Sequence, residues 1–144
     1  MTGKSAKVIV LRKLPAAVEA RMAELFDVEF NNEDRHLDKA EIASAMARAD
    51  VLVSTVTDRI DAELIETAGD QLKLIANFGN GVDNIDVDAA YARSITVTNT
   101  PSVLTEDTAD MVMALILALP RRMVEGDRII REPGSFTGWS PNWM

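Results

Sequence analysis

Short apolar runs recur at a nearly constant interval along the first hundred residues of the chain. They begin between 20 and 23 residues apart, at Val8–Leu11, Val28–Phe30, Val51–Val53, Leu72–Phe78 and Ile95–Val97. Each run is almost continuously apolar, whereas a strand with one face in water alternates apolar and polar residues. The pattern therefore predicts five strands of a parallel sheet that is covered on both faces.

Helical patterns fill the intervals between these runs. Apolar residues lie at helical spacing in 15–25, 42–49 and 60–65, and Asp86 is placed to cap a fourth helix over Val87–Arg93. Pro15 suits the first position of the first helix. Alternating strands and helices predict an α/β fold, a flavodoxin-like doubly wound sheet of five parallel strands. Ligands of such a sheet gather outside the carboxyl ends of its strands.

The character of the sequence changes after Pro101. Thr105 is placed to cap a long helix, and the nine residues Met111–Leu119 are all apolar, so every face of that helix is apolar. Such a helix needs cover on all sides. It is either a central helix of this domain or a helix that meets a partner, which would be a second domain or a second copy of the chain. We expect Pro120 to kink or end it.

The remaining residues predict no regular element. Turn signals occur at Pro133-Gly134 and at Ser140-Pro141. Trp139 and Trp143 are large apolar groups with no helix or strand nearby to pack in.

Composition excludes several classes of function. The chain has 144 residues, no Cys and a formal net charge of −8. Without Cys it has no disulfide framework and no Cys-based zinc site, and we expect no metal site. An acidic balance argues against nucleic acid as a partner. No apolar run is long enough to span a membrane, and none at the N-terminus resembles a secretion signal, so we expect a cytoplasmic protein.

The segment Asn77–Asp86 carries the most informative chemistry. It follows the fourth predicted strand and places Gly79 and Gly81 on either side of Asn80. Glycines permit positive φ and close approach, and successive backbone N–H groups in such a turn can converge on an anion such as a small carboxylate. The alternative is a tight turn that feeds a capped helix. The residue types alone favour neither reading.

Two other chemistries are rejected. Gly79-x-Gly81-x-x-Asn84 is close to a dinucleotide-binding fingerprint, but the third glycine is absent and the loop is not in the first βα unit. His36 is the only histidine and lies in a polar run, so we expect it in solvent rather than in a catalytic or metal site.

Several segments together resemble a known family. They occur in one order along nearly the whole chain: Val56–Asp61, Asn77–Asp86, Ile95–Pro101, Val103–Thr105, Thr108–Asp110 and Gly138–Pro141. This order resembles the D-isomer-specific 2-hydroxyacid dehydrogenases, in particular the glyoxylate and hydroxypyruvate reductase branch.

The resemblance implies two domains. Residues 1–104 would form a flavodoxin-like substrate-binding domain, and residues 105–144 an interdomain helix and the truncated start of a Rossmann domain that binds NAD or NADP. The family's glycine-rich fingerprint and its catalytic Arg, Glu and His would follow the last residue of this chain. The chain would then contain no catalytic residue and would be inactive alone, although its parent would be an oxidoreductase.

The resemblance also implies roles for particular residues. The N–H groups of Asn80 and Gly81 would bind the carboxylate of a small 2-oxo or 2-hydroxy acid. The substrate-binding residues would be Val53, Ser54, Phe78, Gly79, Asn80, Gly81 and Asn99, and the cofactor-binding residues Asn80 and Thr108. The helix 105–131 would form a homodimer. The alternative to part of an enzyme is a non-catalytic module of the same family. Such a module would bind a partner as a corepressor does, or would serve to dimerise.

Overall fold

A computed structural model describes residues 6–142, so the prediction for Trp143 lies outside the described residues. The chain divides into two compact units, Met1–Val103 and Leu104–Met144.

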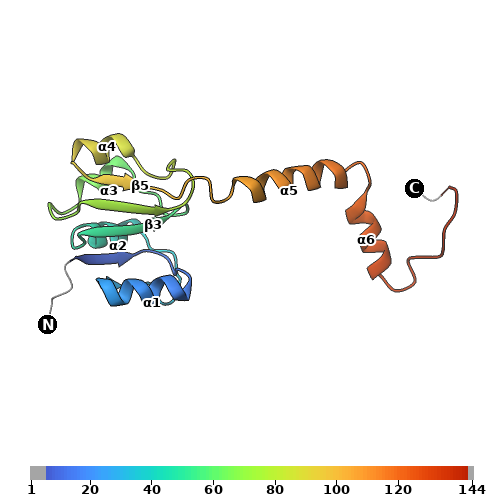
Figure 1. The fold of residues 1–144 in the computed structure, drawn as a ribbon, viewed down its shortest axis with the longest axis horizontal. Coiled ribbons are helices and arrows are strands. Elements are labelled where there is room, and N and C mark those ends of the chain that lie inside the picture. Colours follow the sequence, from blue (N-terminus) through green and yellow to red (C-terminus); the bar gives the residue numbers. More distant parts are fainter. Residues whose placement is uncertain (1–5, 143–144) are drawn as a thin grey trace. The chain divides into compact units, whose positions relative to one another are not determined.

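The first unit contains a five-stranded sheet (Figure 1). Its strands are β1 Lys7–Val10, β2 Asp27–Glu29, β3 Val51–Thr55, β4 Leu74–Phe78 and β5 Thr96–Thr98. Their order is β2-β1-β3-β4-β5, and all neighbours are parallel. This is the order of a flavodoxin-like sheet. The predicted fold class is confirmed, with each strand within one or two residues of its apolar run.

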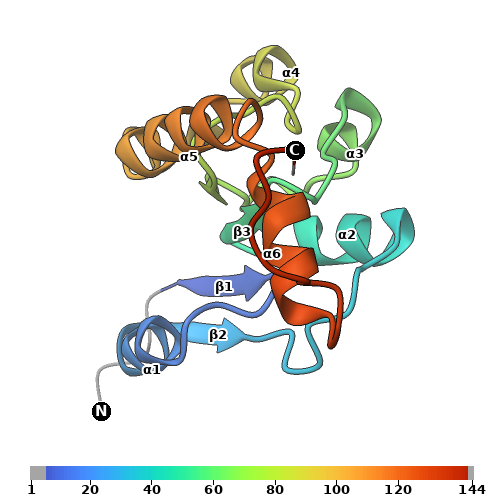
Figure 2. The same ribbon diagram turned by 90° about the vertical axis from the view of Figure 1, so that its right-hand side faces the viewer.

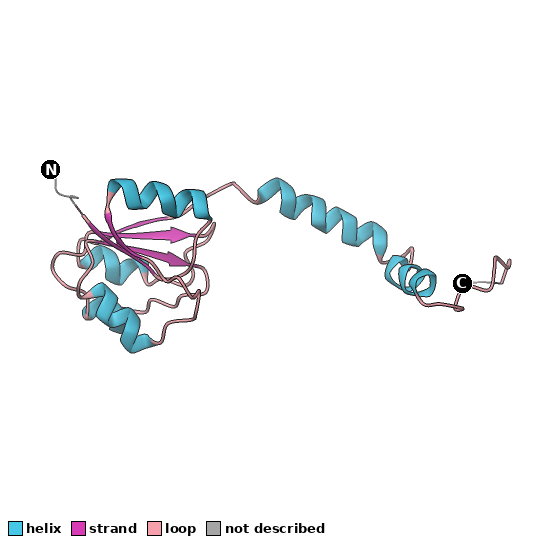
Figure 3. Cartoon of the chain, turned by 90° about the horizontal axis from the view of Figure 1, so that it is seen from below, coloured by secondary structure: helices cyan, strands magenta, loops and turns pink. Residues whose placement is uncertain are grey.

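Helices cover both faces of this sheet (Figure 3). They are α1 Ala16–Leu25, α2 Lys39–Met46, α3 Ala62–Glu66 and α4 Val87–Ala92. On one face, α1 lies beside β1 and β2 (Figure 2) and contributes Met22 to a cluster around Val8 and Val10. Pro15 is the residue before α1 and not its first position, and Val18 and Leu25 of the predicted apolar face are about half exposed.

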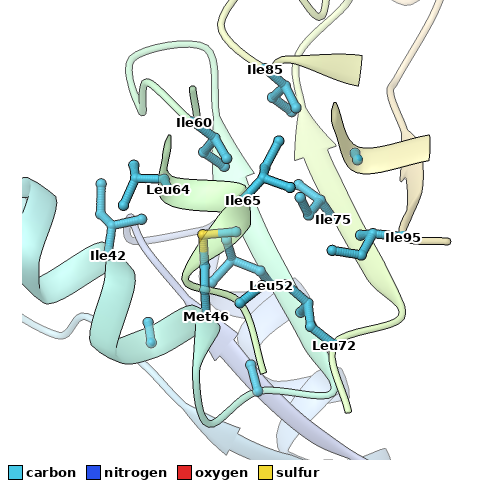
Figure 4. Close-up of a cluster of buried hydrophobic side chains, with 14 of the residues drawn as sticks. Ile42, Met46, Leu52, Ile60, Leu64, Ile65, Leu72, Ile75, Ile85 and Ile95 are labelled. Atoms are coloured by element: carbon cyan, nitrogen blue, oxygen red, sulfur yellow. The ribbon is translucent and has the colours of Figure 1, made fainter. Parts of the chain in front are cut away.

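The larger core lies on the other face of the sheet. Side chains of α2, α3 and the strands converge there (Figure 4), with Met46, Leu52, Ile65 and Ile75 wholly or almost wholly buried. Within β3 and β4 the buried residues of this face alternate with less buried residues of the opposite face. The alternation continues to the carboxyl ends of β3 and β4, where polar residues replace apolar ones on the core side.

Aspartates begin three of these helices. Asp86 accepts a hydrogen bond from the amide of Ala89 at 2.9 Å, which confirms its predicted capping role. Asp61 caps α3 in the same way. At α2, Asp38 accepts from the amide of Glu41 at 2.8 Å, and Glu41 accepts from the amide of Asp38 at 2.9 Å. This reciprocal pair is a capping box.

The second unit contains two helices, α5 Thr105–Ala118 and α6 Met123–Arg131, and not the single helix predicted over 105–131. Pro120 lies in the break, and Arg122 there adopts a left-handed backbone with φ of 52°. Thr105 is the first residue of α5 and not its cap, because Leu104 takes the capping position without a side-chain hydrogen bond. Within residues 6–142, no helix is long and apolar enough to cross a membrane.

The capping box makes a testable contribution to stability. Hydrogen bonds from Arg35 and from the amide of Asp38 lower the pKa of Glu41 from 4.5 to about 2. A carboxylate with a lower pKa in the folded state stabilises it fully above the unfolded pKa, and this stabilisation is lost as pH falls through the folded pKa. In urea unfolding, the wild type should exceed Glu41→Gln in stability most at pH above 4.5, and the difference should shrink towards pH 2.

Glu66→Gln in α3 is the control, since its carboxylate makes no ion pair among the described residues. A difference between wild type and Glu41→Gln that stays constant with pH would show that Glu41 acts through its shape and not its charge.

Candidate functional site

A chain of buried hydrogen bonds shapes the loop that follows β4. Ser54 of β3 and Asn77 of β4 are neighbours in the sheet register, and both side chains are buried. The Ser54 hydroxyl donates to Oδ1 of Asn77 at 3.0 Å, and Nδ2 of Asn77 donates to the carbonyl of Gly81 at 2.9 Å. The end of the strand therefore holds the middle of the loop directly.

Asn84 fastens the far end of the same loop. Its Nδ2 donates to the carbonyls of Thr55 at 3.0 Å and Asp58 at 2.9 Å, both in the segment that follows β3. Backbone hydrogen bonds add to this, because the amide of Ile60 donates to the carbonyl of Asn84 at 2.8 Å. The loops after β3 and β4 are thus joined into one framework at the carboxyl edge of the sheet.

The segment after β5 holds the loop from another side. The amide of Thr100 donates to the carbonyl of Gly79 at 2.9 Å, and Nδ2 of Asn99 donates to the carbonyl of Asn80 at 2.6 Å. In return, Oδ1 of Asn80 accepts from the amide of Ser102 at 3.0 Å. Three hydrogen bonds therefore connect residues 79–80 with residues 99–102.

Five consecutive amides of the loop, from Asn80 to Asn84, donate to no acceptor among residues 6–142, and the first two of them are those predicted to bind a carboxylate. Among residues 6–142, no acceptor meets the N–H groups of Asn80 or Gly81, and both residues are exposed. The amide of Gly79 is not available, because it donates to the carbonyl of Asn77 at 3.0 Å. The substrate role predicted for Gly79 stays a prediction, and its N–H does not support that role because the N–H is already bonded within the chain. Two adjacent N–H donors without internal partners suit the oxygen atoms of an anion.

The glycines of this loop do not adopt the positive φ that the sequence suggested. Among the glycines of residues 6–142, positive φ occurs only at Gly134 and Gly138. Gly79 is required for close packing instead, because a Cβ there would lie 2.2 Å from Cγ1 of Val56. A Cβ on Gly81 would meet only the Asp83 carboxylate, at 3.4 Å.

The other predicted site residues lie in different surroundings. The side chain of Val53 packs with the cluster on the α1 face, and Ser54 is fully buried with its hydroxyl bonded to Asn77. Phe78 is 53% exposed at the end of β4. Asn99 is brought to Asn80. Thr108 belongs to the second unit, where its hydroxyl donates to the carbonyl of Leu104 at 2.7 Å.

Sequence reasoning missed Asn77, Asn84, Thr100 and Ser102. Asn77 carried a signal, since it is a polar residue inside an otherwise apolar strand. Thr100 and Ser102 carried none, because they act through backbone amides that every non-proline residue possesses.

His36 and the acidic residues form no metal site in the described part of the chain, where no group of three or more potential ligands occurs. The His36 side chain is mostly exposed, with Nδ1 4.0 Å from Oδ1 of Asp58. A cleft of about 610 Å³ lies elsewhere, between β2 and α2. Its arginines are already paired, Arg35 with Glu41 and Arg48 with Glu29, so it offers an anionic ligand no unpaired arginine.

The close contact between Gly79 and Val56 predicts that a methyl group added at Gly79 destabilises the fold. Gly79→Ala should lower the free energy of unfolding by about 1–3 kcal/mol, because a stiff β-branched side chain must move to admit it. Gly81→Ala should change it by less than about 0.5 kcal/mol. The double variant Gly79→Ala, Val56→Ala should recover most of the loss, as measured by chemical denaturation. Equal effects of the two glycine substitutions would contradict this account.

Comparison with known proteins agrees with the geometry. Residues 8–138 match the model of the D-isomer specific 2-hydroxyacid dehydrogenase catalytic domain. A glyoxylate reductase from Korarchaeum cryptofilum is 41% identical over 138 residues, which cover 96% of this chain and 41% of that protein. A glyoxylate reductase from Pyrococcus horikoshii is 37% identical, with 96% and 42% covered. The chain therefore spans about two fifths of the length of these curated relatives.

Solved structures share the fold. The TT0316 protein from Thermus thermophilus superposes with a TM-score of 0.81 at 43% identity, covering 94% of this chain and 43% of that one. An NADPH-dependent glyoxylate/hydroxypyruvate reductase from Sinorhizobium meliloti, in complex with NADP and malonate, gives 0.64 at 30% identity, covering 94% and 42%. From the match of its sequence and its fold, this chain belongs to the D-isomer specific 2-hydroxyacid dehydrogenase family.

Proposed function

We propose that this chain is the substrate-binding part of an oxidoreductase that reduces small 2-oxo acids of the glyoxylate and hydroxypyruvate type. The observation that carries the proposal is that the adjacent N–H groups of Asn80 and Gly81 donate to no acceptor among residues 6–142. They lie in the loop after β4, at the edge of the sheet where ligands of doubly wound folds bind. Relatives at about 40% identity are glyoxylate reductases.

The chain's own contribution is to hold the carboxylate of the acid. Each of the two N–H groups donates to a carboxylate oxygen, and hydrogen bonds to an ionised acceptor are stronger than neutral ones. Because the donors belong to a loop fixed on three sides, the acid is held in one orientation with little loss of loop entropy on binding. Malonate, which a relative's structure contains, is a carboxylate of this small class.

NAD or NADP is the proposed cofactor of the whole protein, in line with the NADP bound by that relative. The residues described here do not themselves fit a dinucleotide. The loop after β1 reads Leu11-Arg12-Lys13-Leu14, without the glycines that let a pyrophosphate approach a helix N-terminus. Asn84, at the third glycine position of the near-fingerprint, is committed to the framework described above. The cofactor roles predicted for Asn80 and Thr108 stay predictions.

Binding of a 2-oxo acid analogue tests the proposal. In ¹H–¹⁵N spectra of the 144-residue chain, oxamate should shift the amide resonances of Asn80 and Gly81 in a saturable way. The Gly79 amide should move less, since its N–H already donates to Asn77. Acetamide, which resembles oxamate but carries no charge, is the matched control and should shift neither amide.

The absence of the two shifts at saturating oxamate would refute the carboxylate-binding role. The same chain should not oxidise NADH or NADPH when glyoxylate is added, because His36, its only histidine, lies outside the loop framework. Steady oxidation of either cofactor would show that this chain contains a catalytic centre that the proposal does not recognise.

A second proposed role is self-association through the helices of the second unit. Apolar side chains of α5 are 50–62% exposed, among them Met111, Leu115 and Leu117. Exposed apolar surface of this kind marks an interface in soluble proteins. We propose that a second copy of the chain covers it, as in a homodimer, and this role would persist if the protein were a non-catalytic member of the family.

Leu115→Asp should reduce the mass of the chain in solution from that of a dimer to that of a monomer, as measured by light scattering. A charge at the centre of an apolar interface is expensive to bury. Tyr91→Asp is the control, because Tyr91 is an exposed apolar residue of α4 in the other unit. An unchanged mass for Leu115→Asp would exclude α5 as the interface.

A further inference from the structure

We propose that Asn99 is a positioning residue, which aims the N–H group of Gly81 at the bound carboxylate by holding the carbonyl of Asn80. The inference rests on the proposed function, and it replaces the direct contact with substrate that the sequence suggested for Asn99. It follows from the geometry of two consecutive peptide groups in the loop after β4.

A trans peptide group is planar, with its carbonyl and its N–H pointing in opposite directions. All peptide bonds of the described chain are trans. The carbonyl of Asn80 and the N–H of Gly81 belong to one such group. Because Nδ2 of Asn99 donates to that carbonyl at 2.6 Å, the N–H of Gly81 must point away from Asn99. The direction of this donor is therefore set by a side chain of the segment after β5.

The neighbouring peptide group is held by a different kind of donor. The carbonyl of Gly79 accepts from the backbone amide of Thr100 at 2.9 Å, so the N–H of Asn80 points away from the segment after β5 as well. Both free donors thus face the same general side of the loop. Substitution of Asn99 removes the hydrogen bond that orients the Gly81 N–H. No side-chain substitution removes the backbone bond from Thr100 that orients the Asn80 N–H, so the two donors should respond differently.

The hydrogen bond to Asn80 fixes the orientation of the Asn99 carboxamide. Only a donor can face a carbonyl, so the bond to Asn80 settles which end of the amide is nitrogen. The end that remains, Oδ1, receives no hydrogen bond from residues 6–142. One Nδ2 hydrogen is therefore committed to the carbonyl of Asn80, and through that bond Asn99 orients the peptide group that carries the Gly81 N–H.

The test compares Asn99→Ala with wild type in the oxamate titration of the 144-residue chain. We expect the Gly81 amide to lose its response, the Asn80 amide to keep a weaker one, and the dissociation constant to rise about tenfold, as one hydrogen bond to a charged group is lost. The thermal midpoint should stay close to that of wild type, because Asn99 is exposed. Asn32→Ala, at another exposed asparagine with no hydrogen bond from its side chain to residues 6–142, should change neither response.

A second measurement needs no variant. One of the two Nδ2 hydrogens of Asn99 should exchange slowly with solvent in wild type, as expected for a donor held by a carbonyl. Loss of both amide responses in wild type would refute the proposed function itself. An unchanged Gly81 response in Asn99→Ala, or rapid exchange of both Nδ2 hydrogens, would overturn the positioning role and leave the carboxylate-binding role intact.

Discussion

The hydrogen bonds of the Asn77 carboxamide are the interaction on which the site depends. Asn77 is 2% exposed, and its two ends connect Ser54 of the neighbouring strand with the carbonyl of Gly81 in the loop. A buried amide without partners would cost several kcal/mol, so the loop path and the strand register must satisfy it together. The side chain at the edge of the hydrophobic core on this face of the sheet also holds the loop that follows β4.

The parallel topology explains why three segments meet at this place. In the order β2-β1-β3-β4-β5, the carboxyl ends of β3, β4 and β5 are adjacent, and each sends a loop to the same edge. Asn84 fastens the β4 loop to the β3 loop, and Asn99 with Thr100 fastens it to the β5 segment. Side-chain amides are suited to connecting neighbouring loops, because each offers a donor to one neighbour and an acceptor to another.

The sequence predicted the sheet well, since apolar runs such as Val8–Leu11 report burial on both faces regardless of what surrounds them. It also located the loop around Asn80. It did not predict that the Gly79 amide is bonded internally or that Gly79 makes room for Val56, because both depend on the exact approach of two loops. The range 105–131 holds two helices and not one, and the prediction that Pro120 would kink or end the long helix is confirmed, because α5 ends at Ala118.

The two free donors at Asn80 and Gly81 are main-chain groups. Apart from proline, any residue type at either position would still carry the N–H. Substitutions at these two positions would change the side chains around a bound acid and would leave the N–H groups that bind its carboxylate in place. Under the proposed function, main-chain donors bind the carboxylate that such acids share, and the side chains around them are left to vary with the rest of the acid.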